Sequence, residues 1–382
     1  MKRRGTILTA MLGLLVLTTA VLGGCVPKEP EEQKETVNMD ITVAYSPYVE
    51  EELDHMLSSE KDLPLRKALV EYIDPIFFPT VHDIDFSFYD QRKGGIRTGH
   101  LADVLDTDTK RLSLELVSSD YRYGIAANMS ANPTVSLGGE ETEKELSFIQ
   151  ESGTTEPHRA AMFSSRGRLY VPKDQVTDAS RTLFMNNAAA ALILNRDSCE
   201  VKGIQATYEG LADSFSIVDS TYSFDRKTVI KTDQLDVTRY MGDDQDLPMD
   251  ASPWGYDLSW AKWSRTPLMV CGAGFPSRPL GTSVVNGNVI IWTINLFVNL
   301  ADGTTTRNDI YIGQPLQAGH LKIIKGWLQG DGSFSPTPPI PPQGGGGGFN
   351  PPTPPQPDDS TTVVGVAVML NWQEGGTFNP NL

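Results

Sequence analysis

Apolar and polar residues alternate with a period of two over most of the chain from residue 39 onward, and this pattern limits the fold more than any other feature. In 288–300 the apolar residues at every second position are Ile290, Trp292, Ile294, Leu296, Val298 and Leu300. This period places their side chains on one face of a strand. Similar runs at 84–88, 112–116 and 363–372, with 34 glycines and 26 prolines available for turns, predict an all-β fold of antiparallel sandwiches.

One segment between the first two expected strands has a helical pattern instead. In 49–73 the apolar residues recur at spacings of three and four: Leu53, Met56, Leu57, Leu65, Ala68, Leu69 and Tyr72. A short helix is stable only when this apolar face packs against another element. We therefore expect a small helical insertion in the first sandwich.

A length of 382 residues fits two domains, which we place at 39–177 and 178–382. The first strand is expected at 39–45, and the second series of strands begins near Arg181, with 181–195 as one strand. The segment 335–362 holds ten of the 26 prolines and five consecutive glycines. Neither residue suits the middle of a sheet, so this segment predicts a long exposed loop before a last strand at 363–372.

The first 24 residues have the pattern of an exported lipoprotein signal. Three basic residues precede an apolar run that ends in Leu22-Gly23-Gly24-Cys25. Small residues directly before a cysteine resemble the lipobox of bacterial lipoproteins, which implies cleavage before Cys25 and acylation of its thiol and amino group. A permanent membrane helix is the alternative, but the apolar run is short and no stop-transfer charges follow it. Residues 25–38 are polar and acidic, and predict a flexible tether.

Charge and motif content exclude several function classes. The formal net charge of −16 argues against a nucleic-acid partner, because binding to phosphates needs a basic surface. The five histidines are too far apart for a metal pair, and no metalloprotease, serine-hydrolase or phosphate-loop motif is present. Asp243, Asp244, Asp246 and Asp250 have spacing that calcium can use, although a solvated acidic loop fits them better. The sequence predicts no enzyme, no metal and no cofactor.

Cys199 and Cys271 both fall in the second half of an exported chain, where disulfides can form. They are candidates for a disulfide within that domain, and spacing alone does not decide the pairing. A catalytic cysteine is not indicated, since the sequence suggests no partner histidine.

An aromatic cluster lies in the segment SPWGYDLSWAKW, with Trp254, Tyr256, Trp260 and Trp263. Exposed, these rings would stack on sugars or form a protein interface; the alternative is that they cover the core of the second domain from a loop.

The order of these features resembles the fimbrillin-like lipoproteins of the Bacteroidia. The resemblance rests on the lipobox and tether, on the strand and following turn at Phe86–Gly94, and on the strand pair at Leu114–Asn128, which ends in Ala-Asn. The strands RTLFMNNAAAALILN and VKGIQATYEGLADSF resemble the start of the family's second domain, and VVGVAVMLNW resembles its last strand. The insertion at 49–73 and the loop at 335–362 are not core features of the family.

The resemblance implies two transthyretin-like sandwiches and a role in a type V pilus. In the stalk subunits of this family, removal of the first strand by an arginine-specific protease opens a groove that accepts a strand from a neighbouring subunit, a form of β-augmentation. The donor here would be Val363–Trp372, the lost strand Met39–Tyr45, and Arg66 a conceivable cleavage site, although an ordinary helix-surface arginine fits Arg66 better. A permanent lipid at Cys25 suits an anchor or accessory subunit on the surface of the outer membrane, with other pilus subunits as partners.

The main alternative is a surface glycan-binding lipoprotein, also built from β-sandwiches on a lipid tether. It would use the aromatic cluster at 254–263 as an exposed platform.

Overall fold

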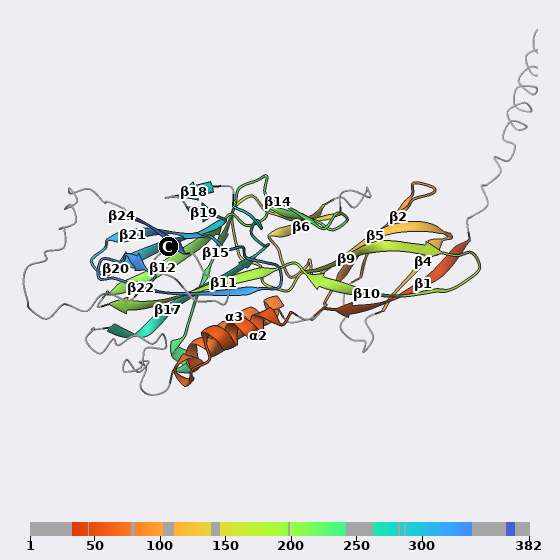
Figure 1. The fold of residues 1–382 in the computed structure, drawn as a ribbon. Helices are drawn as coiled ribbons and strands as arrows, with labels where there is room; N and C mark the ends of the chain where they lie inside the picture. Colours follow the sequence, from red (N-terminus) through yellow and green to blue (C-terminus); the bar gives the residue numbers. More distant parts are fainter. Residues whose placement is uncertain are drawn as a thin grey trace, which may run out of the picture.

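A computed structural model describes most of the chain. The described residues are 33–44, 46–77, 81–101, 111–138, 146–197, 199–241, 263–281, 283–285, 288–337 and 364–370. They form two β-sandwiches placed end to end, with a helical layer under the second (Figure 1). The all-β sandwich fold expected from the alternating pattern is confirmed.

The first sandwich is one seven-stranded sheet that folds over on itself. Its strands, in spatial order, are β3 (Ile96–Leu101), β2 (Ile84–Asp90), β5 (Ser119–Ala127), β9 (Phe163–Val171), β10 (Thr177–Met185), β1 (Lys34–Val43) and β4 (Arg111–Val117). Side chains from both ends of this order share one core, which includes Phe88, Ile125 and Leu183 beside Met39 and Leu112. The two ends of the sheet therefore face each other.

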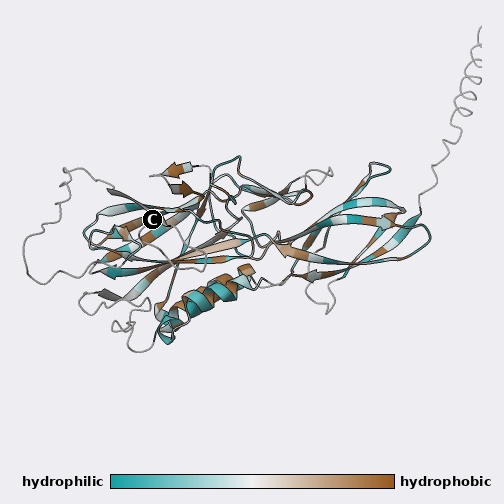
Figure 2. Ribbon diagram, in the orientation of Figure 1, coloured by the Kyte–Doolittle hydropathy of each residue, from teal (hydrophilic) through white to brown (hydrophobic). Residues whose placement is uncertain are grey.

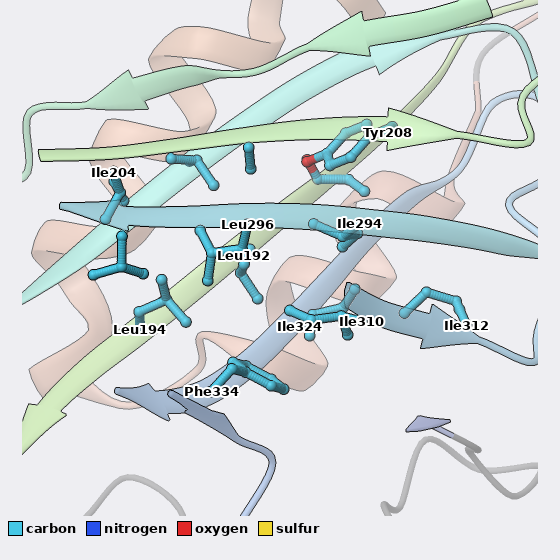
Figure 3. Close-up of a cluster of buried hydrophobic side chains, with 14 of the residues drawn as sticks. Leu192, Leu194, Ile204, Tyr208, Ile294, Leu296, Ile310, Ile312, Ile324 and Phe334 are labelled. Atoms are coloured by element: carbon cyan, nitrogen blue, oxygen red, sulfur yellow. The ribbon is translucent and has the colours of Figure 1, made fainter. Parts of the chain in front are cut away.

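The second sandwich is made of two sheets. One has the order β16 (Asp233–Leu235), β17 (Trp263–Gly274), β11 (Ala188–Asp197), β22 (Leu321–Leu328) and β23 (Phe334–Ser335). The other has the order β24 (Val364–Leu370), β21 (Thr305–Ile312), β20 (Trp292–Leu300), β12 (Val201–Glu209), β15 (Thr228–Lys231) and β8 (Gly153–Thr155). Figure 3 shows their shared core, where Leu192 and Leu194 of β11 meet Ile294 and Leu296 of β20.

The helical segment is present, as predicted, but it packs on the second sandwich and not in the first. It consists of α2 (Tyr48–Met56), the 3₁₀ turn η1 (Glu60–Asp62) and α3 (Leu63–Phe77). Its apolar stripe, including Leu53 and Leu69, lies against β11, β17 and β22, while its outer side is largely polar (Figure 2). β11 is consequently covered on both faces, which explains why every residue from Ala188 to Leu194 is buried.

The run 181–195, predicted as one strand, is two. β10 ends at Met185 in the first sheet, and β11 begins at Ala188 in the second. The change of core therefore lies later than the boundary expected at 177/178, because β10 pairs with β1 and β9. Asn187, between the strands, accepts from the amide of Met162 at 2.5 Å and donates to the carbonyl of Ala160 at 3.1 Å.

A third, smaller sheet joins the two sandwiches. Its order is β14 (Thr221–Ser223), β13 (Ser214–Ser216), β7 (Ser147–Gln150) and β6 (Val135–Gly138), and a separate hairpin pairs β18 (Ser283–Val285) with β19 (Asn288–Ile290). β8, expected in the first domain, pairs with β15 of the second. Strands from both halves of the sequence thus build this joining region around a core that includes Phe148, Phe215 and Phe275.

His158 lies fully buried where the two sandwiches meet. Its Nδ1 is 3.0 Å from the amide nitrogen of Asn187, and its Nε2 is 2.7 Å from the side-chain oxygen of Gln150. The amide nitrogen can only donate and the oxygen can only accept, so the imidazole is neutral with its proton on Nε2. Burial lowers the pKa of His158 to about 3.

Candidate functional site

The first strand is paired along both of its edges in the first sandwich. β1 runs parallel to β10, from Val37 opposite Thr177 to Val43 opposite Leu183. On its other side it is antiparallel to β4, from Lys34 opposite Val117 to Asp40 opposite Arg111. It begins at Lys34, earlier than the expected residue 39, so part of the predicted tether at 25–38 is strand. A strand with neighbours on both sides leaves a groove when it is removed.

The inner face of β1 fills part of the first core. Val37, Met39 and Ile41 are all buried, and all belong to the cluster that holds the sandwich together. Burial of an apolar side chain of this size contributes about 2 kcal/mol. The side chains of β1 are therefore a substantial part of the stability of the first sandwich.

A polar ladder ties the outer face of β1 to both neighbouring strands. Asn38 donates to Asp178 of β10 at 3.1 Å and accepts from Ser113 of β4 at 3.0 Å. Arg111 of β4 reaches Asp40 at 3.0 Å and Asp178 at 3.3 Å. These contacts are solvent-exposed, so they set register more than they add stability.

Among the described residues, the last strand pairs with a neighbour on one side only. β24 pairs in parallel with β21, from Thr306 opposite Val364 to Ile312 opposite Leu370, and forms the end of the six-stranded sheet. The predicted last strand at 363–372 is therefore found. Most of the predicted loop at 335–362 lies outside the described residues, and β23 occupies its start. Within the described part of the chain, β24 thus has one line of pairing where β1 has two.

Arg66 lies inside α3 and is engaged by the neighbouring helix. Its guanidinium is 2.7 Å from Asp54 and 3.2 Å from Glu50 of α2, and a quarter of its side chain is exposed. A protease binds its substrate in an extended form, so cleavage at Arg66 would require α3 to unwind. This geometry fits an ordinary helix-surface arginine.

Cys199 and Cys271, both described, are not joined by a disulfide. Cys199 lies in the core between the two sheets of the second sandwich, whereas Cys271 lies in the cluster under the helices. The two thiols are on opposite sides of the five-stranded sheet, which explains why this candidate pair does not form a disulfide. Burial raises the pKa of Cys271, so its thiol stays protonated.

Other predicted sites lie outside the described residues. These are Cys25, the aromatic residues Trp254, Tyr256 and Trp260, and the aspartates at 243–250. Trp263 begins β17, and only its backbone is described. Within the described part of the chain, no group of three or more His, Cys, Asp or Glu side chains is placed to hold a metal ion, and no helix has the length and apolarity to cross a bilayer.

Sequence patterns did not point to β10 as the parallel partner of β1. Its polar outer residues, such as Asp178, resemble those of any half-exposed strand, and its partner lies about 140 residues earlier in the chain. The only local signal was Asn186-Asn187, a pair that interrupts the apolar run and marks the passage between the two sandwiches.

No protein-family model and no curated protein sequence matches the chain. Among solved structures, it is similar to an adhesin of Bacteroides thetaiotaomicron, with 12% identity and a TM-score of 0.46 over 80% of this chain and 95% of that one. An adhesin of Bacteroides ovatus gives 10% identity and a TM-score of 0.46 over 75% and 87%. The fimbrial anchor protein Mfa2 of Porphyromonas gingivalis gives 11% and 0.40 over 69% and 78%. Identities and scores this low assign no function to this chain.

Proposed function

We propose that this chain is a non-enzymatic, lipid-anchored adhesion protein that serves as the anchor or accessory subunit of a fimbrillin-type pilus. It keeps its first strand and donates its last. Acylation at Cys25 would hold it on the outer membrane, exposed to the cell surface, and its partners would be other pilus subunits. The observation that carries the proposal is the difference between β1, which is paired on both sides, and β24, which is paired on one.

The position of Cys25 explains why β1 should be retained. Only eight residues separate Cys25 from Lys34, the start of β1, so a lipid on that cysteine would lie within about 30 Å of the strand. A cut between β1 and β2 would leave the lipid on the fragment that carries β1, and the remaining chain would lose its membrane anchor. The engagement of Arg66 in the helical layer supports the uncut form.

The position of β24 explains why it should be the donated strand. It follows a segment rich in glycine and proline that is long enough to let it reach another molecule. Its sequence alternates valine with small residues, a pattern that fills successive pockets of a groove while the main chain pairs with the groove's edges. Loss of β24 would leave the core between β20 and β11 in place, because each of these two strands lies in the interior of its own sheet.

Two engineered disulfides test the proposal, one for each strand. Arg307→Cys with Gly365→Cys joins β24 to β21 at positions paired in register, and Thr36→Cys with Glu115→Cys joins β1 to β4 in the same way. Paired positions in a sheet are about 5 Å apart at Cα, a separation that a disulfide spans. Each single-cysteine variant is the control for its pair.

The assay is crosslinking mass spectrometry on intact cells with a tagged copy of the protein. We expect crosslinks between residues 363–382 and a fimbrillin-type subunit, an intact acylated Cys25 peptide, and loss of those crosslinks only in the β24-locked variant. The β1 lock should leave them unchanged. If the β1 lock abolishes the crosslinks and the β24 lock does not, the chain accepts a strand, and the anchor assignment is wrong.

A further inference from the structure

A cleft of about 350 Å³ lies between the start of α2 and the loop that connects β21 to β22. Its walls carry one aromatic ring pair and several long polar side chains, and they belong to segments far apart in the sequence. The lining residues used below are Tyr48, Glu51, Glu52, Gln317, His320 and Lys322. Its lining residues belong to neither β1 nor β24.

The aromatic pair forms one wall of the cleft. The rings of Tyr48 and His320 are stacked, with centroids 4.0 Å apart and planes 12° from parallel. Tyr48 nevertheless remains 47% exposed. Because one face of its ring is covered by the imidazole, the exposed area must come from the opposite face and the edge. Tyr48 thus offers a flat apolar surface that is held in place from behind.

The loop opposite α2 is fixed in position before any ligand binds. The amide of Gly319 donates to the carbonyl of Asn187 at 2.6 Å, and the carbonyl of Gly319 accepts from Ser46 at 2.5 Å. Gly319 has a φ of +75°, which favours glycine. Trp292 donates to the carbonyl of Gln314 at 2.9 Å. A loop held in this way loses little conformational entropy on binding.

The polar groups of the cleft suit hydroxyl and amide ligands. Nδ1 of His320 is 3.0 Å from the carbonyl of Ala318, so that nitrogen carries the proton and Nε2 is an acceptor in the neutral ring. Glu52 is already engaged, since it accepts from the amide of Ile323 at 2.8 Å and lies 3.5 Å from Lys322. Gln317 and Glu51 are exposed at the rim. With two glutamates against one lysine, the walls disfavour an anionic ligand.

We propose that this cleft is a carbohydrate subsite that binds one neutral hexose or N-acetylhexosamine residue. The sugar's C–H face would lie on the open face of Tyr48, and its hydroxyls would bond to Gln317 and Glu51. A pyranose has one apolar C–H face and a rim of hydroxyls. The cleft offers the Tyr48 ring to the first and the polar side chains of Gln317 and Glu51 to the second. This binding role goes beyond pilus anchoring and gives the surface protein a ligand of its own.

The test is saturation-transfer NMR on the purified chain without its first 25 residues. The probes are glucose, galactose, N-acetylglucosamine and N-acetylgalactosamine at millimolar concentration, with glucuronic acid as the anionic comparison. We expect transfer to the ring protons of at least one neutral sugar, with little to glucuronic acid. Tyr48→Ala should weaken binding about tenfold, whereas Tyr48→Phe should retain it.

Tyr170→Ala is the matched control, because Tyr170 is 57% exposed on β9 of the first sandwich, far from the cleft in the fold. It should leave sugar binding unchanged. Equal thermal unfolding of both alanine variants and the parent would establish that each is folded. The proposal is overturned if none of the four neutral sugars shows transfer, if Tyr48→Ala binds as the parent does, or if glucuronic acid binds better than glucose.

Discussion

The neutral, buried His158 predicts a specific pH dependence of stability. Its pKa is about 3 in the folded chain, against an ordinary value of 6.5. Between these values the unfolded chain binds a proton that the folded chain does not, so the free energy of unfolding falls as the pH falls below 6.5. The loss approaches about 1.4 kcal/mol per pH unit well below pH 6.5, and it amounts to about 2.5 kcal/mol between pH 7.0 and 4.5.

The hydrogen bonds around the ring explain why protonation is so unfavourable. A second ring proton on Nδ1 would face the amide nitrogen of Asn187, which also donates. Rotation of the Asn187 amide would not relieve this conflict, because its oxygen already accepts from the backbone of Met162. The ring centroid of Phe275 lies 4.9 Å from that of the imidazole, and Phe275 provides no charge that would stabilise the protonated ring. Protonation therefore breaks contacts between the two sandwiches as well as burying a charge.

The measurement compares the parent with His158→Gln, which keeps a donor and an acceptor but does not titrate. Urea unfolding followed by tryptophan fluorescence at pH 7.0, 6.0, 5.5 and 4.5 gives the free energy of unfolding by linear extrapolation. The other four histidines are common to both proteins and cancel in the difference. We expect the advantage of the parent to shrink by about 2.5 kcal/mol from pH 7.0 to 4.5. A difference that stays constant with pH would refute the neutral, buried state of His158.

Three further predictions concern single elements. Met39→Ala, at a fully buried position of β1, should lower the free energy of unfolding by about 2–5 kcal/mol in urea titrations, while Thr36→Ala on the exposed face should change it by less than about 0.5 kcal/mol. Asp62→Asn should lower the free energy of unfolding by about 3–5 kcal/mol in the same assay, because it removes the carboxylate 3.7 Å from Lys325 and leaves a buried ammonium unpaired. Burial already lowers the pKa of Lys325, and adding Lys325→Met should recover most of the loss. Cys271, buried and with a raised pKa, should react with a thiol reagent only after denaturation, and reaction in the native protein would contradict its placement under the helices.

Local patterns were sufficient to predict several of the longer strands, including β2, β4, β20 and β24. The alternation in 288–300 corresponds to β20, whose Trp292, Ile294 and Leu296 point into the second core as expected. A half-buried strand has the same period wherever it sits in a sheet, so the pattern carries no information about its neighbours. This explains why β1 was predicted but its parallel pairing with β10 was not.

Long-range packing accounts for the predictions that were wrong. The apolar stripe of α2 and α3 predicted helical structure but not the sheet that the helices cover, because such a stripe can pack against any apolar face. The information lay instead in β11, whose continuous run AAAALIL has no polar face and so needs a layer on each side. Cys199 and Cys271 were candidates for a disulfide on compartment alone, and their separation by a sheet depends on the same covering of β11.

The path of the chain makes β1 and the second sandwich depend on each other. The chain leaves β1 at Val43, enters α2 at Tyr48, and covers the second sandwich before it returns to the first at β2. Glu52 of α2 accepts from the amide of Ile323 in β22, and Asp62 of η1 pairs with Lys325 of the same strand. β22 therefore contacts both α2 and η1. A pull on β1 therefore acts on contacts of both sandwiches, and release of the strand would need cleavage within or before this layer. Such an arrangement fits a subunit that keeps β1 in place and bears load through it, which is what an anchor requires.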